Sequence, residues 1–171
     1  MTSGVEEKVK KGSGSGRPAR SYATGPVTVW LRRLVLVATA AVTVWVLVRY
    51  PGMPDTVPVH FGAGGDADDW GSKSTILWLS LIMLACISGC HWLSSRPRIF
   101  NYPKELTEGN AQAMYRAGEQ MMVWLNAGLV VCYLGIAAGM LTDINILVIL
   151  LPGLVLLLGS TVVGIVKMVR A

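Results

Sequence analysis

The chain has 171 residues, of which 53% are hydrophobic and 15% are charged, and its mean hydropathy is +0.52. A charged fraction well below the roughly 25% of soluble domains, together with long uncharged runs, excludes an ordinary soluble domain and indicates an integral membrane protein. The net charge of +5 is better explained by membrane topology than by nucleic-acid binding, because the basic residues flank the apolar runs.

The first 27 residues are rich in Gly, Ser, Lys and Arg. Such a segment buries too little apolar surface to offset the entropy of ordering, so we predict a disordered, basic cytoplasmic tail over residues 1–27. Binding of this tail to anionic lipid headgroups is an alternative. Residues 28–171 are predicted to form a single transmembrane domain.

Four apolar runs follow, and we predict an all-α membrane protein with transmembrane helices at about 30–50, 74–95, 120–142 and 144–166. The last three runs have 22 or 23 residues, which at 1.5 Å per residue span roughly 33 Å, enough for a hydrocarbon core of about 30 Å. The first run is shorter, but Arg33 and Arg49 can extend to the headgroups at its ends. No small-residue cleavage site follows it, so we expect an uncleaved anchor.

The basic residues set the expected orientation. With the N-terminus in the cytoplasm, 13 of the 15 Lys and Arg residues lie inside, and only Arg49 and Lys73 lie outside. Both termini are therefore predicted to be cytoplasmic, and the loop 51–73 extracytoplasmic. The expected aromatic belts contain Trp30, Trp92 and Trp124 on the inner side, and Trp70 and Trp78 on the outer side.

The third and fourth spans are predicted to form an antiparallel helical hairpin around a tight turn at 142–145. The third helix is expected to begin at about residue 108, with Thr107 as its N-cap, and Asn126 to form a hydrogen bond across helices. Glycines in both spans favour close helix contact; they are Gly128, Gly135, Gly139, Gly153, Gly159 and Gly164.

The loop 51–73 carries four of the five Asp residues and is dense in Pro and Gly. Proline and β-branched residues predict an extended stretch over 55–61, with Val57, Val59 and Phe61 on one face. The glycines at 62, 64 and 65 then allow a reversal, and Ser72 is the expected N-cap of the second span.

Two polar features of this loop have alternative interpretations. Lys73 lies at the N-terminus of a helix, where a cation is unfavourable, so either Asp68 or Asp55 is expected to pair with it unless it extends to lipid phosphates. His60 with the loop carboxylates allows a weak metal hypothesis, and so does His91 with Cys86 and Cys90; a hydrogen-bonded His60 that shapes the turn is the simpler interpretation. We expect no cofactor and no metal. The three cysteines lie in apolar runs and imply no disulfide framework.

The loop resembles the signature of a bacterial membrane domain of unknown function, which also forms the N-terminal part of SdpI-like toxin immunity proteins. The residues that carry the resemblance are Pro54, Asp55, Val57, Pro58, His60, Phe61, Gly65, Asp68, Trp70, Gly71, Ser72 and Lys73. Met53, Gly62, Ala67 and Asp69 depart from the family pattern. The resemblance implies a multi-pass protein of the bacterial cell membrane and a link to peptide-toxin immunity.

We therefore predict a non-enzymatic membrane protein whose extracytoplasmic loop recognises an envelope ligand. Peptide-toxin immunity and sensing are the two functions that we associate with such recognition. The expected core of this loop, for binding or for structure, comprises Pro54, Asp55, Pro58, His60, Phe61, Gly65, Asp68, Trp70 and Lys73. The alternative is a small subunit or assembly partner of an envelope or transport complex. An enzyme or autonomous transporter ranks lowest, because the span centres contain no Asp, Glu, Lys or Arg. The expected partners are thus the lipid bilayer and a peptide or membrane protein, and not nucleic acid.

Overall fold

The computed structural model describes residues 16–171, which form four long helices and one two-stranded antiparallel sheet. The helices are α1 (Pro26–Arg49), α2 (Thr75–Ser94), α3 (Ala111–Leu141) and α4 (Leu147–Arg170), and the strands are β1 (Thr56–Phe61) and β2 (Ala67–Ser72). Short 3₁₀ turns at Tyr50–Gly52 and Pro97–Ile99 follow α1 and α2. Each of the four helices is long and apolar enough to cross a membrane, which confirms the predicted number of spans within residues 16–171.

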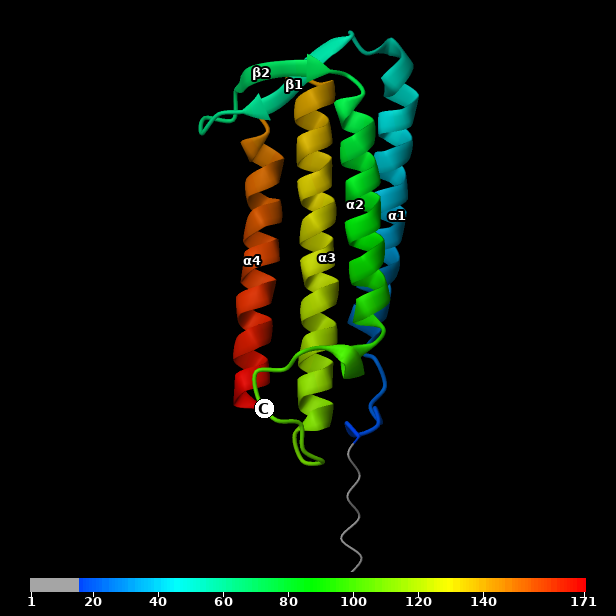
Figure 1. Ribbon diagram of the computed structural model, residues 1–171, viewed down its shortest axis with the longest axis vertical. Helices are drawn as coiled ribbons and strands as arrows, with labels where there is room; N and C mark the ends of the chain where they lie inside the picture. The colour runs from blue at the N-terminus through cyan, green and yellow to red at the C-terminus, as the bar shows by residue number, and fades with distance from the viewer. Residues whose placement is uncertain (1–15) are drawn as a thin grey trace, which may run out of the picture.

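Helix α3 occupies the centre of the bundle and packs against α1, α2 and α4, whereas α4 packs mainly on α3. Figure 1 shows the four helices side by side, with the β1–β2 hairpin lying across one end. In the apolar stretch of α3, half of the residues are buried within the protein, compared with 11% in the apolar stretch of α4. The outer surface of α4 is therefore available to lipid or to another protein.

Glycines bring α3 and α4 into close contact, as predicted. A Cβ atom at Gly128 would lie 2.8 Å from the backbone nitrogen of Leu157, and one at Gly153 would lie 2.8 Å from that of Cys132. Gly159 is an exception, because a Cβ atom there would have no neighbour within 4 Å. The prediction of a helix contact at Gly159 is wrong, because a gap lies between α3 and α4 at this position.

The main apolar core lies between α1, α2, α3 and β1. Val46, Ile76 and Tyr133 have no exposed surface, and Val57 of β1 closes the core beneath the hairpin. The predicted cross-helix hydrogen bond is present: Asn126 Nδ2 donates to the carbonyl oxygen of Ile87 at 3.1 Å.

Several boundaries differ from the predictions: α4 is Leu147–Arg170 rather than 144–166, and three further differences have an identifiable cause. Helix α1 begins at Pro26 rather than near 30, since a proline suits the first turn of a helix. Helix α3 is a single helix but begins at Ala111, so Thr107 is not its N-cap. Instead, the Thr107 N–H donates to Asn110 Oδ1 and the Asn110 N–H donates to Thr107 Oγ1. These two hydrogen bonds stabilise a turn in place of helix. Ser72 is not the N-cap of α2, because its pairing with Thr56 keeps it in β2.

The predicted disordered tail covers residues 1–27, of which 1–15 lie outside the described residues. Residues 16–25 differ from that prediction, because several of them form hydrogen bonds with the bundle. We call residues 17–25 the N-terminal segment.

Candidate functional site

The hairpin formed by β1 and β2 occupies most of the predicted loop, and the extended segment expected over 55–61 is confirmed as β1. Thr56 lies opposite Ser72, Pro58 opposite Trp70, and Phe61 opposite Ala67, with an irregular register on both sides of His60. The Gly62 N–H donates to the Asp66 carbonyl oxygen at 2.9 Å and closes the tip. The Lys73 N–H donates to the Asp55 carbonyl oxygen at 2.9 Å and closes the base.

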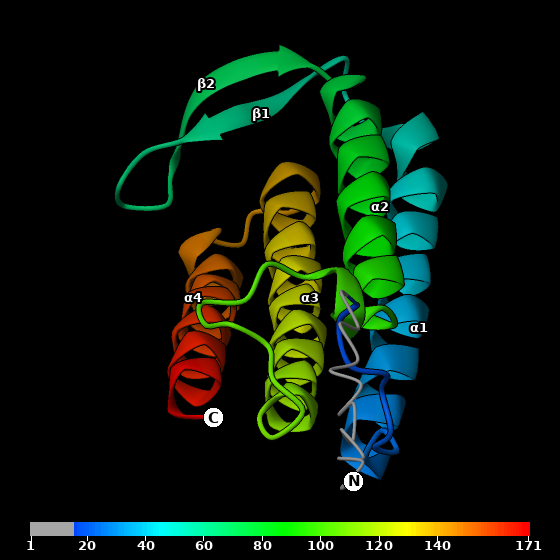
Figure 2. The same cartoon turned by 60° about the horizontal axis from the view of Figure 1, so that its bottom comes forward.

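The tip of the hairpin is attached to the turn between α3 and α4. Asn145 Nδ2 donates to the Gly64 carbonyl oxygen at 2.8 Å. Gly65 has a φ of 82°, and a side chain there would collide with Asn145 and Leu147. The Phe61 ring lies on Gly139, where a Cβ atom would be 3.0 Å from Phe61 Cζ. The hairpin is thereby held across the ends of α3 and α4, as Figure 2 shows.

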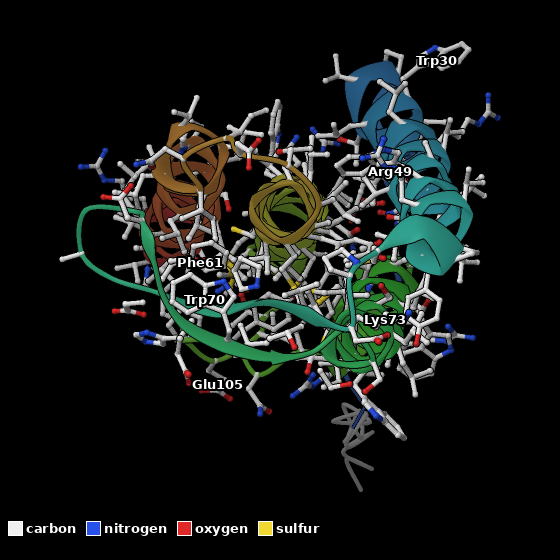
Figure 3. All side chains as sticks on the ribbon, turned by 90° about the horizontal axis from the view of Figure 1, so that it is seen from above. Trp30, Arg49, Phe61, Trp70, Lys73 and Glu105 are labelled. Atoms are coloured by element: carbon white, nitrogen blue, oxygen red, sulfur yellow. The ribbon has the colours of Figure 1, made fainter. Side chains whose placement is uncertain are left out.

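A cleft of about 340 Å³ lies between the hairpin and the α3–α4 turn. We call it the hairpin cleft. Its lining residues are Pro58, Phe61, Gly65, Asp66, Ala67, Trp70, Gly139, Thr142, Asp143, Ile144 and Asn145. Figure 3 shows Phe61 and Trp70 close together near α4, with Lys73 at the opposite end of the hairpin above α2.

The chemistry of the hairpin cleft favours a cationic group with apolar parts. Two aromatic rings, those of Phe61 and Trp70, provide flat apolar surfaces whose faces attract cations. Asp66 and Asp143 add carboxylates, and the lining residues include no Lys or Arg. A positively charged ligand is thus favoured by both kinds of side chain.

The polar residues predicted for the loop core form two separate pairs. Lys73 Nζ lies 3.0 Å from Asp55 Oδ1 and 5.6 Å from the centre of the Tyr50 ring, so Asp55 rather than Asp68 is its acidic partner. His60 Nδ1 lies 2.5 Å from Asp68 Oδ1, as expected for a histidine that shapes the turn. Both pairs are exposed to solvent, since the Asp55 side chain is 95% exposed and those of His60 and Asp68 are 69% and 51% exposed. Each pair therefore stabilises the fold by no more than about 1 kcal/mol.

The nine predicted core residues are therefore divided among two recesses and two separate ion pairs. Pro58, Phe61, Gly65 and Trp70 line the hairpin cleft. Pro54 lines a second recess of about 270 Å³, together with Arg49 and Met53 at the end of α1. Asp55, His60, Asp68 and Lys73 belong to the two ion pairs and line neither space.

The metal alternatives gain no geometric basis from the structure. Among residues 16–171, no three His, Cys, Asp or Glu side chains come together in a way that could hold a metal ion. His60 has one carboxylate partner, and the group of Cys86, Cys90 and His91 does not qualify either.

A second polar centre lies at the opposite end of the bundle, around Glu119 of α3. The carboxylate is 1% exposed and accepts hydrogen bonds from Arg32 Nη2 at 2.8 Å, Tyr22 Oη at 2.7 Å and Thr24 Oγ1 at 2.8 Å. Arg20 Nη2 lies 3.2 Å from it. A buried carboxylate without partners would be strongly unfavourable, and these four donors satisfy it.

The Glu119 centre joins three parts of the chain. Arg32 of α1 also donates to the Ser94 carbonyl oxygen at the end of α2, at 3.1 Å. Tyr22 belongs to the N-terminal segment, and its burial, its hydrogen bond to Glu119 and the charge of Glu119 all raise its pKa. The phenol therefore keeps its proton at neutral pH and remains a donor to the carboxylate.

The N-terminal segment is further attached along its length. Arg17 Nη1 donates to the Phe100 carbonyl oxygen at 2.6 Å, Gln112 Nε2 donates to that of Ala19 at 2.7 Å, and Tyr115 Oη donates to that of Pro18 at 3.0 Å. These contacts join it to α3 and to the segment after α2, at the lower end of the bundle in Figure 1.

Sequence reasoning singled out neither Glu119 nor Arg32. One signal was present: Tyr115, Glu119, Met122 and Asn126 recur at helical spacing and so share one face of α3. A carboxylate on the same helical face as a buried asparagine predicts a partner on a neighbouring helix. The partners from residues 20–24 had no comparable signal, because their approach depends on the tertiary fold.

The four helices, of which α3 is central, make this chain a multi-pass membrane protein. Residues 34–84, which comprise most of α1, the hairpin and the first half of α2, match the family described as "Domain of unknown function (DUF1648)". An uncharacterized protein of Archaeoglobus fulgidus is 44% identical over 52 residues, which are 30% of this chain and 28% of that protein. The chain thus covers less than a third of that relative, and no solved structure matches it. The predicted resemblance is confirmed as far as the domain of unknown function, and its connection to SdpI-like immunity proteins stays a prediction.

Proposed function

We propose that the hairpin cleft binds a cationic, partly apolar ligand of the cell envelope, such as a peptide, on the extracytoplasmic side of the membrane. The observation that carries this proposal is the cleft itself, whose lining combines the Phe61 and Trp70 rings with Asp143 of the α3–α4 turn. In this proposal the protein binds its ligand without catalysing a reaction.

The attachment of the hairpin supports a binding role. Asn145 and Gly65 hold the tip against the α3–α4 turn, so the two walls of the cleft are positioned before a ligand arrives. A site that is organised in advance loses less conformational entropy on binding. The lining offers carboxylates and the Thr142 hydroxyl, but no His, Cys or Lys that could act with them as a nucleophile–base pair.

Calorimetric titration of the purified protein with two blocked tetrapeptides tests the charge preference. We expect Lys-Leu-Leu-Lys to bind and Glu-Leu-Leu-Glu to bind at least tenfold more weakly. Asp143→Asn should weaken the first interaction about fivefold, the value of one exposed charge pair of about 1 kcal/mol. Trp70→Ala should weaken it about tenfold or more, because an aromatic anchor is lost.

Asp55→Asn is the matched control, since it removes a hairpin carboxylate that does not line the cleft. Its affinity should equal that of the wild type. Equal binding of the two peptides, or equal effects of the Asp55 and Asp143 variants, would contradict the proposal.

Peptide-toxin immunity is the biological form of this function that the family resemblance implies. Cells that carry the wild-type protein should then survive a cationic peptide toxin that kills cells carrying Trp70→Ala at the same membrane level. Equal survival of the two strains would exclude the immunity hypothesis. The titration would still decide separately whether the cleft binds a ligand.

A second candidate function is that of a subunit in a membrane complex, and the exposed surface of α4 favours it. Val148, Leu151, Leu158 and Val162 are at least half exposed and lie on a helix of which little is buried within this chain. A photo-crosslinker at Leu158 should then join one specific protein in native membranes. Crosslinks to lipid alone would exclude this candidate.

A further inference from the structure

A groove opens sideways between α3 and α4, toward the end of the bundle that carries Glu119. It has a volume of about 350 Å³, and we call it the lateral groove. Its walls are Ala117, Gln120, Met121 and Trp124 of α3, and Val155, Leu156, Gly159, Ser160, Val163, Gly164 and Lys167 of α4.

The groove exists because α3 and α4 separate locally between two close contacts. Gly128 packs against Leu157 on one side, and Gly164 packs against Met121 on the other. Between them, Gly159 contributes no side chain, and a Cβ atom there would meet no other atom within 4 Å. The chain thus leaves an apolar space that opens between two helices, each long and apolar enough to cross a membrane.

One end of the lateral groove is basic. Lys167 lies in the last turn of α4, and no Asp or Glu oxygen of residues 16–171 is within 4 Å of its ammonium group. The buried carboxylate at this end of the bundle, Glu119, is already engaged by Arg20 and Arg32. Trp124 also lines the groove and is 42% exposed, so its indole can report contact with a bound acyl chain.

We propose that the lateral groove binds an anionic phospholipid, with one acyl chain along Gly159 and the phosphate beside Lys167. An apolar channel of this kind, ending at a cation that no carboxylate of residues 16–171 contacts, complements both parts of such a lipid. Lys167 favours the anionic headgroup over a zwitterionic one, because a basic side chain near the membrane surface attracts anionic lipid. This site is independent of the hairpin cleft.

Quenching of Trp124 fluorescence by brominated lipids tests the proposal with the full chain in vesicles. Vesicles contain either brominated phosphatidylglycerol or brominated phosphatidylcholine, and the Trp124 signal is the difference between the wild type and Trp124→Phe. We expect the anionic lipid to quench this signal at a lower mole fraction. In Lys167→Gln the preference should fall about fivefold, which corresponds to about 1 kcal/mol for one basic side chain near the surface.

Two matched controls separate the groove from general lipid contact. Gly159→Leu fills the groove, and Gly89→Leu adds the same side chain to α2, where a Cβ atom also meets nothing within 4 Å. Quenching by the anionic lipid should decrease in the first variant and remain in the second. Arg170→Gln removes a neighbouring charge that does not line the groove and should keep most of the preference.

Three other outcomes would contradict the proposed lipid site. Equal quenching by the two lipids in the wild type would remove the headgroup preference. Equal effects of Gly159→Leu and Gly89→Leu would show that the groove holds no bound chain. Retention of the full preference in Lys167→Gln would exclude the proposed phosphate contact.

Discussion

At the scale of single residues, Glu119 has the environment with the largest energetic consequence. Its carboxylate is almost completely buried, yet Arg32, Tyr22 and Thr24 donate to it from two other parts of the chain. Removing one member of a buried charged cluster leaves the others without a partner, which is more unfavourable than the loss of an exposed ion pair. Glu119 thus contributes strongly to the attachment of the N-terminal segment, together with the hydrogen bonds of Arg17, Gln112 and Tyr115.

Replacement of Glu119 by Gln should destabilise the protein by about 1–3 kcal/mol, below the value for a completely buried pair because both arginines retain some solvent contact. The melting temperature in detergent should fall, and trypsin should cleave after Arg20 faster than in the wild type. Glu108→Gln, which alters an exposed carboxylate at the same end, is the control and should change neither measurement.

Tyr22 adds a pH dependence to the same centre. Its pKa is higher in the folded protein than the unfolded value of about 10, so its contribution to stability is complete below pH 10. The contribution is lost as the pH rises above 10 toward the folded pKa. The melting temperature of the wild type should therefore fall more steeply above pH 10 than that of Tyr22→Phe, and parallel curves would contradict this role.

At the scale of elements, the hairpin depends on the attachment of its tip. Gly65 adopts a positive φ that suits glycine, and the Asn145 and Leu147 side chains occupy the space that a Cβ atom would need. The tip and the α3–α4 turn consequently fix each other, and the width of the hairpin cleft follows from this contact.

Gly65→Ala should destabilise the hairpin by about 1–3 kcal/mol, through backbone strain and the collision with Asn145. Gly64→Ala is a closely matched comparison, because its Cβ atom would make only an ordinary contact of 3.4 Å with Asp66. Hydrogen exchange of the β1 and β2 amides should accelerate in the first variant and stay unchanged in the second. Equal exchange in both would show that the tip does not hold the hairpin.

The hairpin also shows which features could be predicted from the sequence. Proline and β-branched residues define β1, and glycines define the reversal, because these preferences are local. The choice of Asp55 over Asp68 as the partner of Lys73 was left open, because it depends on the irregular register around His60. The hairpin cleft and the Glu119 centre were not predicted, since each joins segments that are distant in the chain and meet only in the tertiary fold.

At the scale of the whole molecule, charge is distributed unequally between the two ends of the bundle. In the part of the chain that the structure describes, Arg49 and Lys73 are the basic residues at the hairpin end, and the other Lys and Arg residues lie at the opposite end. Lys and Arg residues close to the ends of membrane spans are retained in the cytoplasm during insertion. The more basic end of the bundle is therefore expected to be cytoplasmic, and the hairpin end is expected to face outward. The proposed envelope ligand requires this orientation, which makes orientation a direct test of the proposal.

Cysteine labelling in intact cells measures the orientation of the hairpin end relative to the membrane. In a background with Cys86, Cys90 and Cys132 replaced by Ala, Asp69→Cys places a thiol on the hairpin and Lys104→Cys places one between α2 and α3, both at exposed positions. A membrane-impermeant maleimide should label the first variant in intact cells and the second only after permeabilisation. The reverse pattern would put the hairpin cleft in the cytoplasm, where no envelope ligand could reach it. The ligand proposal would then be wrong, because it requires the outward orientation that the charge asymmetry predicts.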